Sequence, residues 1–480
     1  MRLTDIFYLA ERYLIIGCIA AGFIVGIFCI IYFVLYKKIL HGTAVFPLKK
    51  LAAAAVILCY LIVVLGATML DRGAVWNHGR ITLSLFLSYR EAWYSFSIRE
   101  WRNIILNICM FIPLGLLLPL YGKYWRKAVF TYLTGLAFTL LIELAQLVFN
   151  RGIFELDDIF NNLLGTMIGY GLYRLLHLLP KFHPASGNTR HSCRNKPLSA
   201  ALLYQIPLIM TVILFGTVFI VYQQQEFGNL REHYIHKADL SATDLQLQTE
   251  LSSDTQTVPV YQMTIANEAE THALAQALFA KLGTQIDESE TDLYDETAIY
   301  WSQGRNYNVW IDYAGCRMHF TDFTAYDSGT QLTGKSGCSK EDLQTTFDQL
   351  GIQIPDSADF QDLGDGKYLF DADLREPDRL CQGSLSCTCD ADGRICSFDN
   401  SILTYQKYRN CEILSEQEAY DQLKNGKFRT DYLETDLISI TINSVCLSYT
   451  ADSKGFYQPI YIFSGMLNGE TAEIGIPALK

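Results

Sequence analysis

Six windows of about twenty mostly apolar residues lie within the first 222 residues and constrain what this chain can fold into. A window of that length crosses the hydrocarbon core of a bilayer as a helix, because lipid offers no hydrogen-bond partner to an unpaired backbone amide. We therefore predict a mainly α polytopic membrane domain with about six transmembrane helices. The predicted spans are residues 13–36, 51–70, 103–121, 128–149, 159–179 and 199–222.

The charge changes sign where the last window ends. Residues 1–222 carry 20 Lys and Arg against 9 Asp and Glu, and the remaining residues carry 18 against 41. We therefore predict an acidic α+β domain over 223–480, long enough to build its own core. A net charge of -12 argues against a nucleic-acid partner, which needs clustered cations. The predicted domains are 1–180 in the membrane, 181–222 as a cytoplasmic loop with the sixth span, and 223–480.

The basic residues also predict the orientation of the chain. Lys and Arg gather in the loops after the first, third and fifth predicted spans, and such loops face the cytoplasm. Both termini and the acidic domain are then extracytoplasmic, and the protein is a multi-pass protein of the cell membrane. The loop at 71–102 lies on the opposite side and holds five arginines, which weakens this asymmetry.

Polar residues follow one face of each of three predicted spans. Asn103 and Asn107 are four residues apart, and Glu143 and Gln146 continue a stripe on the next span. Asp158 and Asn162 do the same on the fifth span, so all three stripes fall near the outer ends of their helices. An ionisable side chain inside a membrane segment is costly, and it is read first as a functional residue. The sequence thus predicts a polar pocket at the outer face.

Three interpretations of these residues remain open. Hydrogen bonds between buried amides could simply join the helices. The site could instead bind an anionic headgroup, with Arg151 meeting the phosphate. It could also be catalytic, with Glu143, Asp157 and Asp158 as metal or acid–base groups. Asp157 and Asp158 are adjacent and point about 100° apart on a helix, so one of them could cap a helix end. No metal-binding motif is present, and we expect no metal and no cofactor.

The pattern from Trp101 to Leu176 resembles the VanZ-like family of membrane proteins. The family shows an N-x3-F-x-P-x-G run, then E-x2-Q near a helix end, then Arg, two acids, Asn and spaced glycines. The corresponding residues here are Asn107, Phe111, Pro113, Gly115, Glu143, Gln146, Arg151, Asp157, Asp158, Asn162, Gly165 and Gly169. Gly165 and Gly169 permit close helix packing, and Pro113 with Gly115 would bend or loosen the third span.

The resemblance implies a role in the bacterial cell envelope without specifying a reaction. The founding member of the family is linked to low-level resistance to the glycopeptide antibiotic teicoplanin. The expected ligands are therefore a membrane lipid, a lipid-linked wall precursor or such an antibiotic. The expected ligand-binding residues are Asn107, Glu143, Gln146, Arg151, Asp158 and Asn162. Two other functions stay open: an enzyme acting on lipid phosphate or pyrophosphate, and an anchor for an extracytoplasmic sensor domain.

The acidic part contains three predicted helix N-termini, at Asn267, Ser339 and Ser415, each followed three residues later by an acidic residue. Alternating segments at 307–320, 437–449 and 455–463 predict strands, with Pro459 confining the last to an edge or a bulge. Two or three α+β modules are expected, with an extracytoplasmic protein as a candidate partner. Eight cysteines in an extracytoplasmic domain predict disulfides; they are Cys316, Cys338, Cys381, Cys387, Cys389, Cys396, Cys411 and Cys446.

Overall fold

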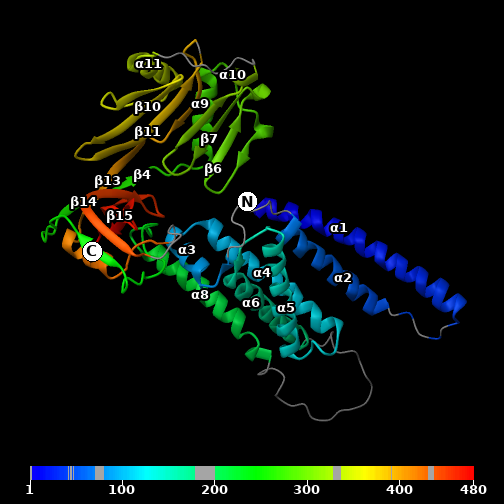
Figure 1. The fold of residues 1–480 in the computed structure, drawn as a ribbon. Coiled ribbons are helices and arrows are strands. Elements are labelled where there is room, and N and C mark those ends of the chain that lie inside the picture. The colour runs from blue at the N-terminus through cyan, green and yellow to red at the C-terminus, as the bar shows by residue number, and fades with distance from the viewer. Residues whose placement is uncertain are drawn as a thin grey trace. The chain divides into compact units, whose positions relative to one another are not determined.

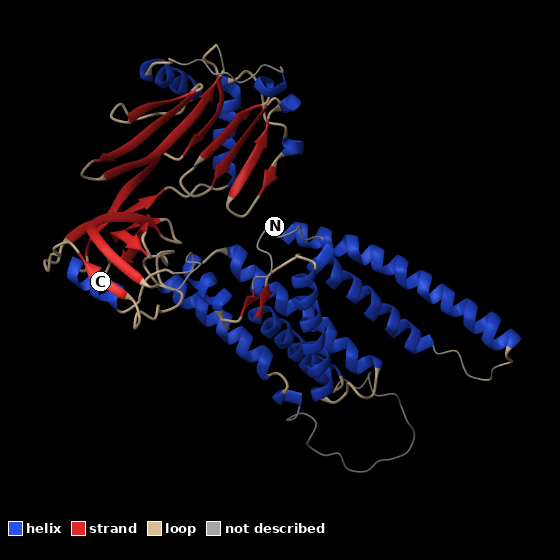
Figure 2. Cartoon of the chain, in the orientation of Figure 1, coloured by secondary structure: helices blue, strands red, loops and turns tan. Residues whose placement is uncertain are grey.

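A computed structural model of the chain divides into two compact units, one of helices and one of strands (Figures 1 and 2). The helical unit comprises Met1–Trp93 and Ser97–Glu226, and the sheet unit comprises Tyr94–Phe96 and Phe227–Lys480. The structure describes residues 3–41, 43, 46, 48–70, 81–178, 201–327, 337–390, 392–430 and 437–480.

The helical unit is built from long helices and one short parallel strand pair. The helix α1 (Leu3–Ile30) continues as the π-helix η1 (Ile31–Ile39), and α2 (Leu48–Leu65) continues as η2 (Gly66–Leu70). The strand β1 (Ile81–Thr82) pairs with β2 (Phe154–Glu155). The other helices are α3 (Leu87–Ser95), α4 (Ile98–Tyr121), α5 (Ala128–Val148), α6 (Leu156–Leu176) and α8 (Ile206–Gln224).

Five helical segments in the described part of the chain are long and apolar enough to cross a membrane. They are Glu11–Ile39, Lys50–Leu70, Ile98–Tyr121, Ala128–Val148 and Ala201–Gln224. These correspond to five of the six predicted spans. The sixth, at 159–179, is the helix α6, whose first two turns carry Asp157, Asp158, Asn161 and Asn162. Most of those side chains face other helices, so α6 is an enclosed helix with a polar start.

Close backbone contact joins α4 to α6 through glycine. A Cβ atom on Gly165 would lie 2.0 Å from the carbonyl oxygen of Ile108, and one on Gly169 would lie 2.0 Å from that of Ile112. On α4, a Cβ on Gly115 would lie 2.0 Å from the Thr166 carbonyl oxygen. Small residues allow helices to approach this closely. The helix α4 itself runs unbroken through Pro113 and Pro119.

The sheet unit contains one 14-stranded sheet, in place of the two or three modules expected. Eleven strands follow the order β3-β14-β15-β4-β13-β11-β12-β8-β7-β6-β5, and β10, β9 and β16 branch from this path. The strands are β3 (Asp244–Leu247), β4 (Thr257–Met263), β5 (Asp292–Leu293), β6 (Thr297–Trp301), β7 (Tyr307–Asp312), β8 (Met318–Asp322), β9 (Asp359–Gly364), β10 (Lys367–Arg375), β11 (Arg379–Cys389), β12 (Ile395–Asn400), β13 (Leu403–Glu412), β14 (Ser439–Ala451), β15 (Phe456–Leu467) and β16 (Glu470–Pro477).

The helices of the sheet unit begin where their capping residues predict. Asn267 and Ser415 form complete capping boxes at α9 (Glu268–Lys281) and α12 (Glu416–Lys424). Ser339 accepts from the Asp342 amide at α11 (Lys340–Leu350). Two short 3-10 turns, η4 (Glu288–Glu290) and η5 (Gln303–Arg305), and the short helix α10 (Thr324–Asp327) complete the unit. These caps satisfy amides that the helix itself leaves free.

The two largest apolar cores of the sheet unit lie on different parts of the sheet. One lies among α9, α11 and strands β6 to β12, and includes Phe347 and Tyr368. The other lies among α12, β14, β15 and β16, and includes Leu423 and Phe463. The helices bury one face against the sheet in both cores, as an α+β arrangement requires.

Two predictions about this unit are wrong. Pro459 does not lie in an edge strand, because β15 pairs with β14 on one side and with β4 and β16 on the other. It falls between the end of the β4 pairing at Tyr457 and the start of the β16 pairing at Ile460, where a missing amide hydrogen breaks no ladder bond on that side. The eight cysteines are free thiols, so the structure contains none of the expected disulfides among them.

Candidate functional site

The polar residues predicted on three spans contact one another across α4, α5 and α6. The Asn107 side-chain amide on α4 donates to the carboxylate of Asp158 on α6. One turn further along α6, Asn162 Nδ2 donates to Thr139 Oγ1 on α5 at 2.9 Å. The first turns of α6 are therefore connected to both neighbouring helices by side-chain hydrogen bonds.

Glu143 places a carboxylate at the beginning of α6. Its side chain is buried, with 1% of the residue surface exposed, and the backbone amide of Glu155 donates to its Oε2 at 3.2 Å. Glu155 is the residue that precedes the first turn of α6. A negative charge is favourable at a helix N-terminus, where the amide dipoles point toward it.

Gln146, one turn further along α5, fixes the end of α2. Its Nε2 donates to the backbone carbonyl oxygen of Thr68 in η2 at 2.9 Å. Since a carbonyl oxygen can only accept, this bond sets the orientation of the Gln146 amide, and its Oε1 is the remaining acceptor. That oxygen is buried and has no hydrogen-bond partner among the described residues.

Asn162 leaves a second buried acceptor. Its Oδ1 is also without a hydrogen-bond partner within the described ranges, and only 2% of the residue surface is exposed. A buried acceptor left unpaired costs about 1–3 kcal/mol. Because Thr139, Glu143 and Gln146 lie on one face of α5, the two free oxygens and the Glu143 carboxylate belong to one polar cluster. We use the term polar cluster for Asn107, Thr139, Glu143, Gln146, Asp158 and Asn162.

Asp157 does something different from its neighbour Asp158. Its carboxylate accepts from the Phe86 amide at 2.5 Å and from the Ser88 amide and hydroxyl at 2.8 Å each. These groups lie at the N-terminus of α3, so Asp157 caps α3 from a distant part of the chain. The adjacent Asn161 accepts from Tyr89 on the same helix at 2.5 Å. Sequence reasoning missed this role because the capping residue and its helix are about 70 positions apart.

The carboxylates therefore do not gather into one metal site. Glu143, Asp157 and Asp158 contact three different elements: the start of α6, the start of α3, and α4. Across the part of the chain that the structure describes, no three His, Cys, Asp or Glu side chains lie close enough to hold a metal ion.

Arg151 lies in the turn between α5 and β2. Its backbone amide donates to the Gln146 carbonyl oxygen at 2.8 Å, and the preceding Asn150 adopts a positive φ of 54°. This arrangement ends α5 in the way a helix C-terminus commonly ends. The Arg151 side chain is half-buried.

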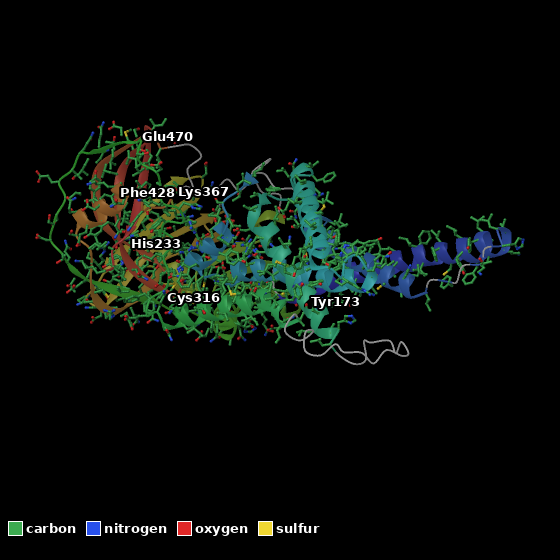
Figure 3. The ribbon with its side chains drawn as sticks, turned by 90° about the horizontal axis from the view of Figure 1, so that it is seen from below. Tyr173, His233, Cys316, Lys367, Phe428 and Glu470 are labelled. Carbon is green, nitrogen blue, oxygen red and sulfur yellow. The ribbon has the colours of Figure 1, made fainter. Side chains whose placement is uncertain are left out.

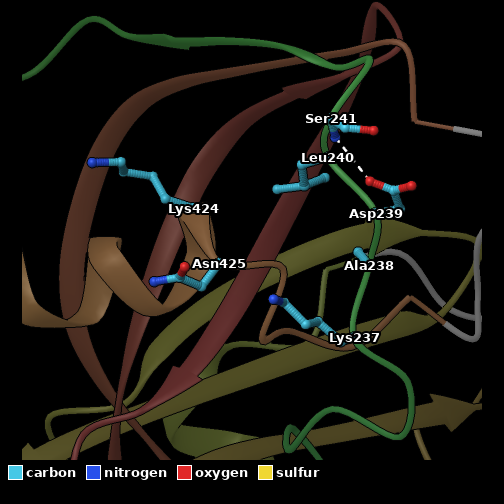
Figure 4. Close-up of a pocket in the computed structure, with 7 residues that line it drawn as sticks. All are labelled: Lys237, Ala238, Asp239, Leu240, Ser241, Lys424 and Asn425. Atoms are coloured by element: carbon cyan, nitrogen blue, oxygen red, sulfur yellow. Dashed lines mark hydrogen bonds between the residues drawn. The ribbon is translucent and has the colours of Figure 1, made fainter.

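The sheet unit contains a hollow of 460 Å³ that none of the predicted site residues line. Its walls come from residues 237–241 and from the end of α12, and include Lys237 and Lys424 (Figure 4). Lys424 is already paired with Asp421 at 3.4 Å, and Asp239 accepts from the Ser241 amide at 3.0 Å. The hollow is open to solvent, so exposed lysines there remain well hydrated.

Comparison with known proteins agrees with the helical unit. The family model described as VanZ/LLP1 matches residues 52–177, which contain the whole polar cluster. This region of the chain is therefore VanZ-like, and the strands from β3 onward lie outside it. No curated protein and no solved structure matches the chain. Together with the five helices of spanning length, the match indicates a membrane protein.

Proposed function

We propose that the polar cluster of the VanZ-like region binds a component of the bacterial cell envelope through hydrogen bonds. The observation that carries this proposal is a pair of buried oxygens, Gln146 Oε1 and Asn162 Oδ1, that have no hydrogen-bond partner among the residues the structure describes. A cluster that serves only to join helices would be expected to pair its buried acceptors internally. A bound ligand would donate hydrogen bonds to these two oxygens.

The chemistry of the cluster restricts the ligand. Its free groups are acceptors, so they favour a molecule with hydroxyl, amide or ammonium donors. Sugars and peptides carry such donors, and both occur in lipid-linked wall precursors and in glycopeptide antibiotics. Arg151 would meet a phosphate in a lipid-linked precursor. We rank the lipid-linked precursor first, because it combines many hydroxyl and amide donors with a phosphate.

Access to the cluster is proposed from the outer leaflet. The Lys and Arg of the intervening loops favour that orientation, which also makes the sheet unit extracytoplasmic. Asn107, Asp158 and Arg151 are half-buried, whereas Glu143, Gln146 and Asn162 are buried. The ligand would contact the half-buried residues first and displace them enough to reach the buried residues.

A ligand-induced rise in melting temperature tests the proposal. Purified protein in detergent would be titrated with a lipid-linked disaccharide-pentapeptide, with undecaprenyl phosphate, and with teicoplanin. A ligand at one hundred times its Kd stabilises the folded protein by about 2.7 kcal/mol. We expect the precursor to raise the melting temperature most. If none of the three raises it, the proposed ligand class is wrong.

The chain offers a matched control for this titration. Asn103 and Asn107 share α4 and a helix face, but Asn103 is exposed whereas Asn107 bonds to Asp158. Asn107→Ala should weaken the ligand-induced shift, and Asn103→Ala should leave it intact. Equal effects of the two substitutions would show that the precursor binds elsewhere.

Two alternatives predict different outcomes. An enzyme acting on lipid pyrophosphate would release phosphate when given Mg²⁺. A membrane anchor for the sheet unit fits the division of the chain into two units. In that case Glu143→Ala would alter no phenotype, while removal of the sheet unit would abolish it.

A further inference from the structure

Three cysteines of the sheet unit surround one buried tyrosine. Tyr368 on β10 lies directly opposite Cys387 on β11, and Cys389 follows two positions later on the same face of that strand. Tyr368 and Cys389 have no exposed surface, and Cys387 is also buried. Figure 3 labels Lys367, which begins β10 just before this tyrosine.

The third cysteine approaches this face from another element. Cys338 precedes Ser339, the capping residue of α11, and its backbone amide donates to the Tyr368 hydroxyl at 3.1 Å. Its side chain packs against the same apolar core as Cys387 and Cys389. The side chain of Cys338 also acts on the pKa of the Cys389 thiol, which it lowers. Two thiols from elements far apart in sequence therefore lie in the same part of the core.

We propose that Cys338 and Cys389 form a dithiol that a low-molecular-weight disulfide oxidises to an intrachain disulfide bond. The half-buried Cys338 meets the oxidant first. Its thiolate attacks the disulfide, forms a mixed disulfide and releases one thiol. The Cys389 thiolate then attacks Sγ of Cys338 and releases the second thiol. The two cysteines lose two electrons and two protons, and the oxidant is reduced to two thiols.

Cys387 is a poorer partner for Cys389 than Cys338 is. Two positions along one strand separate their Cα atoms by about 6.6 Å, near the upper limit for a disulfide, and their side chains run parallel. Cys387 nevertheless influences the reaction through its side-chain hydrogen bond to Cys389. The bond from Cys387, and then burial, raise the pKa of the Cys389 thiol. The second step is therefore slow at neutral pH and becomes faster as the pH rises.

The disulfide would fasten the start of α11 to the face of β11. Because it closes a long loop, it restricts the unfolded chain and stabilises the folded one. Oxidation should therefore raise the melting temperature of the full-length protein, and a reducing agent should reverse the change. An extracytoplasmic position of the sheet unit would provide the oxidising conditions.

Peptide mapping tests this proposal. Full-length protein in detergent would be incubated with oxidised glutathione, alkylated, digested with trypsin and analysed by mass spectrometry. Cleavage at Lys and Arg places Cys338 in the peptide 336–340 and places Cys381, Cys387 and Cys389 together in 380–394. We expect a disulfide between these two peptides that forms faster at pH 9 than at pH 7.

Single substitutions identify the partner. The link should persist in Cys387→Ser and in the control Cys446→Ser, whose cysteine is exposed, and should disappear in Cys389→Ser. The rise in melting temperature should be absent from Cys338→Ser, whose half-buried position tolerates the change. No link between the two peptides, glutathione retained on Cys338 without closure, or a link that survives Cys389→Ser would each overturn the proposal.

Discussion

The two units place polar and apolar side chains in opposite ways. In the helical unit, Ile19 and Phe23 are 68% and 70% exposed, whereas Glu143 is 1% exposed. In the sheet unit, Phe370 and Phe463 are fully buried, and the acids lie mostly on the surface. Large apolar residues remain exposed in quantity only where the solvent is lipid. The same chain is therefore built for two solvents, and buried polar groups signify something different in each unit.

In the sheet unit, buried polar groups are mostly structural. Ser415 caps α12, and Gln458 donates to the carboxylate of Asp452 at 2.5 Å and to the Gly228 carbonyl oxygen at 3.1 Å. In the helical unit, Asp157 has such a role, but Gln146 and Asn162 keep buried oxygens without partners in the described structure. Buried atoms without partners among the described residues also occur in the sheet unit, for example Asn308 Oδ1 and Gln344 Nε2. The polar cluster differs because it joins polar residues of three neighbouring helices.

The largest expected effect concerns the glycine contacts of the helical unit. Gly165→Ala would place a Cβ 2.0 Å from the Ile108 carbonyl oxygen, and α4 and α6 would have to separate. We expect a loss of about 3 kcal/mol or more, measured by thermal unfolding in detergent. Gly216→Ala on α8 is the matched control, because nothing lies within 4 Å of its Cβ position. Equal stability of the two variants would contradict the close packing of α4 and α6.

A smaller effect is expected from removing the cap of α3. Asp157→Ala leaves the Phe86 and Ser88 amides without their acceptor, which costs about 2 kcal/mol. In Asp157→Ala, hydrogen exchange should become faster over residues 86–92. The exchange rate in Asp157→Asn, which keeps one acceptor oxygen, should lie between the rates of the parent protein and of Asp157→Ala. If exchange in α3 did not change, the role of Asp157 would have to be reassigned to the polar cluster.

The smallest effect is a pH dependence in the sheet unit. The Ser415 amide donates to the Glu418 carboxylate at 2.8 Å, and Lys480 lies 3.5 Å from it. These contacts hold the pKa of Glu418 below its ordinary value of 4.5. The stabilisation is therefore complete above pH 4.5 and is lost as the pH falls through the lower pKa of the folded state.

The substitution Glu418→Gln tests the direction of this pH dependence of stability. Between pH 5 and pH 3, unfolding of the variant should depend less on pH than unfolding of the parent protein does. Glu412→Gln, which removes an exposed charge outside the cap, should keep the slope of the parent. A slope that does not change in Glu418→Gln would show that the cap does not contribute to acid sensitivity.

Local features of the fold could be predicted from the sequence, because their causes are local. The caps at Asn267, Ser339 and Ser415 are confirmed. Five of the apolar windows form helices that are long and apolar enough to span a membrane, and this property depends only on composition and length. The sixth window falls outside this set because polar residues such as Asn161 and Asn162 lower the mean hydropathy of α6.

Long-range features could not be predicted in the same way. Nothing near Asp157 in sequence indicates that it caps α3, and nothing near Pro459 shows that the partner strand changes there. The order of the 14 strands depends on packing between distant segments. For the site, helical periodicity placed Glu143 and Gln146 on one face, but it could not show which of their oxygens remain unpaired.

The most direct test of the account uses Gln146→Met with two readouts. The substitution keeps the side-chain volume, removes the unpartnered Oε1 and removes the bond to Thr68, so the stability without ligand should change by less than about 1 kcal/mol. We predict that the shift in melting temperature caused by the lipid-linked precursor is lost in this variant. A large loss of stability with the ligand-induced shift intact would contradict the account and make the polar cluster a purely structural feature.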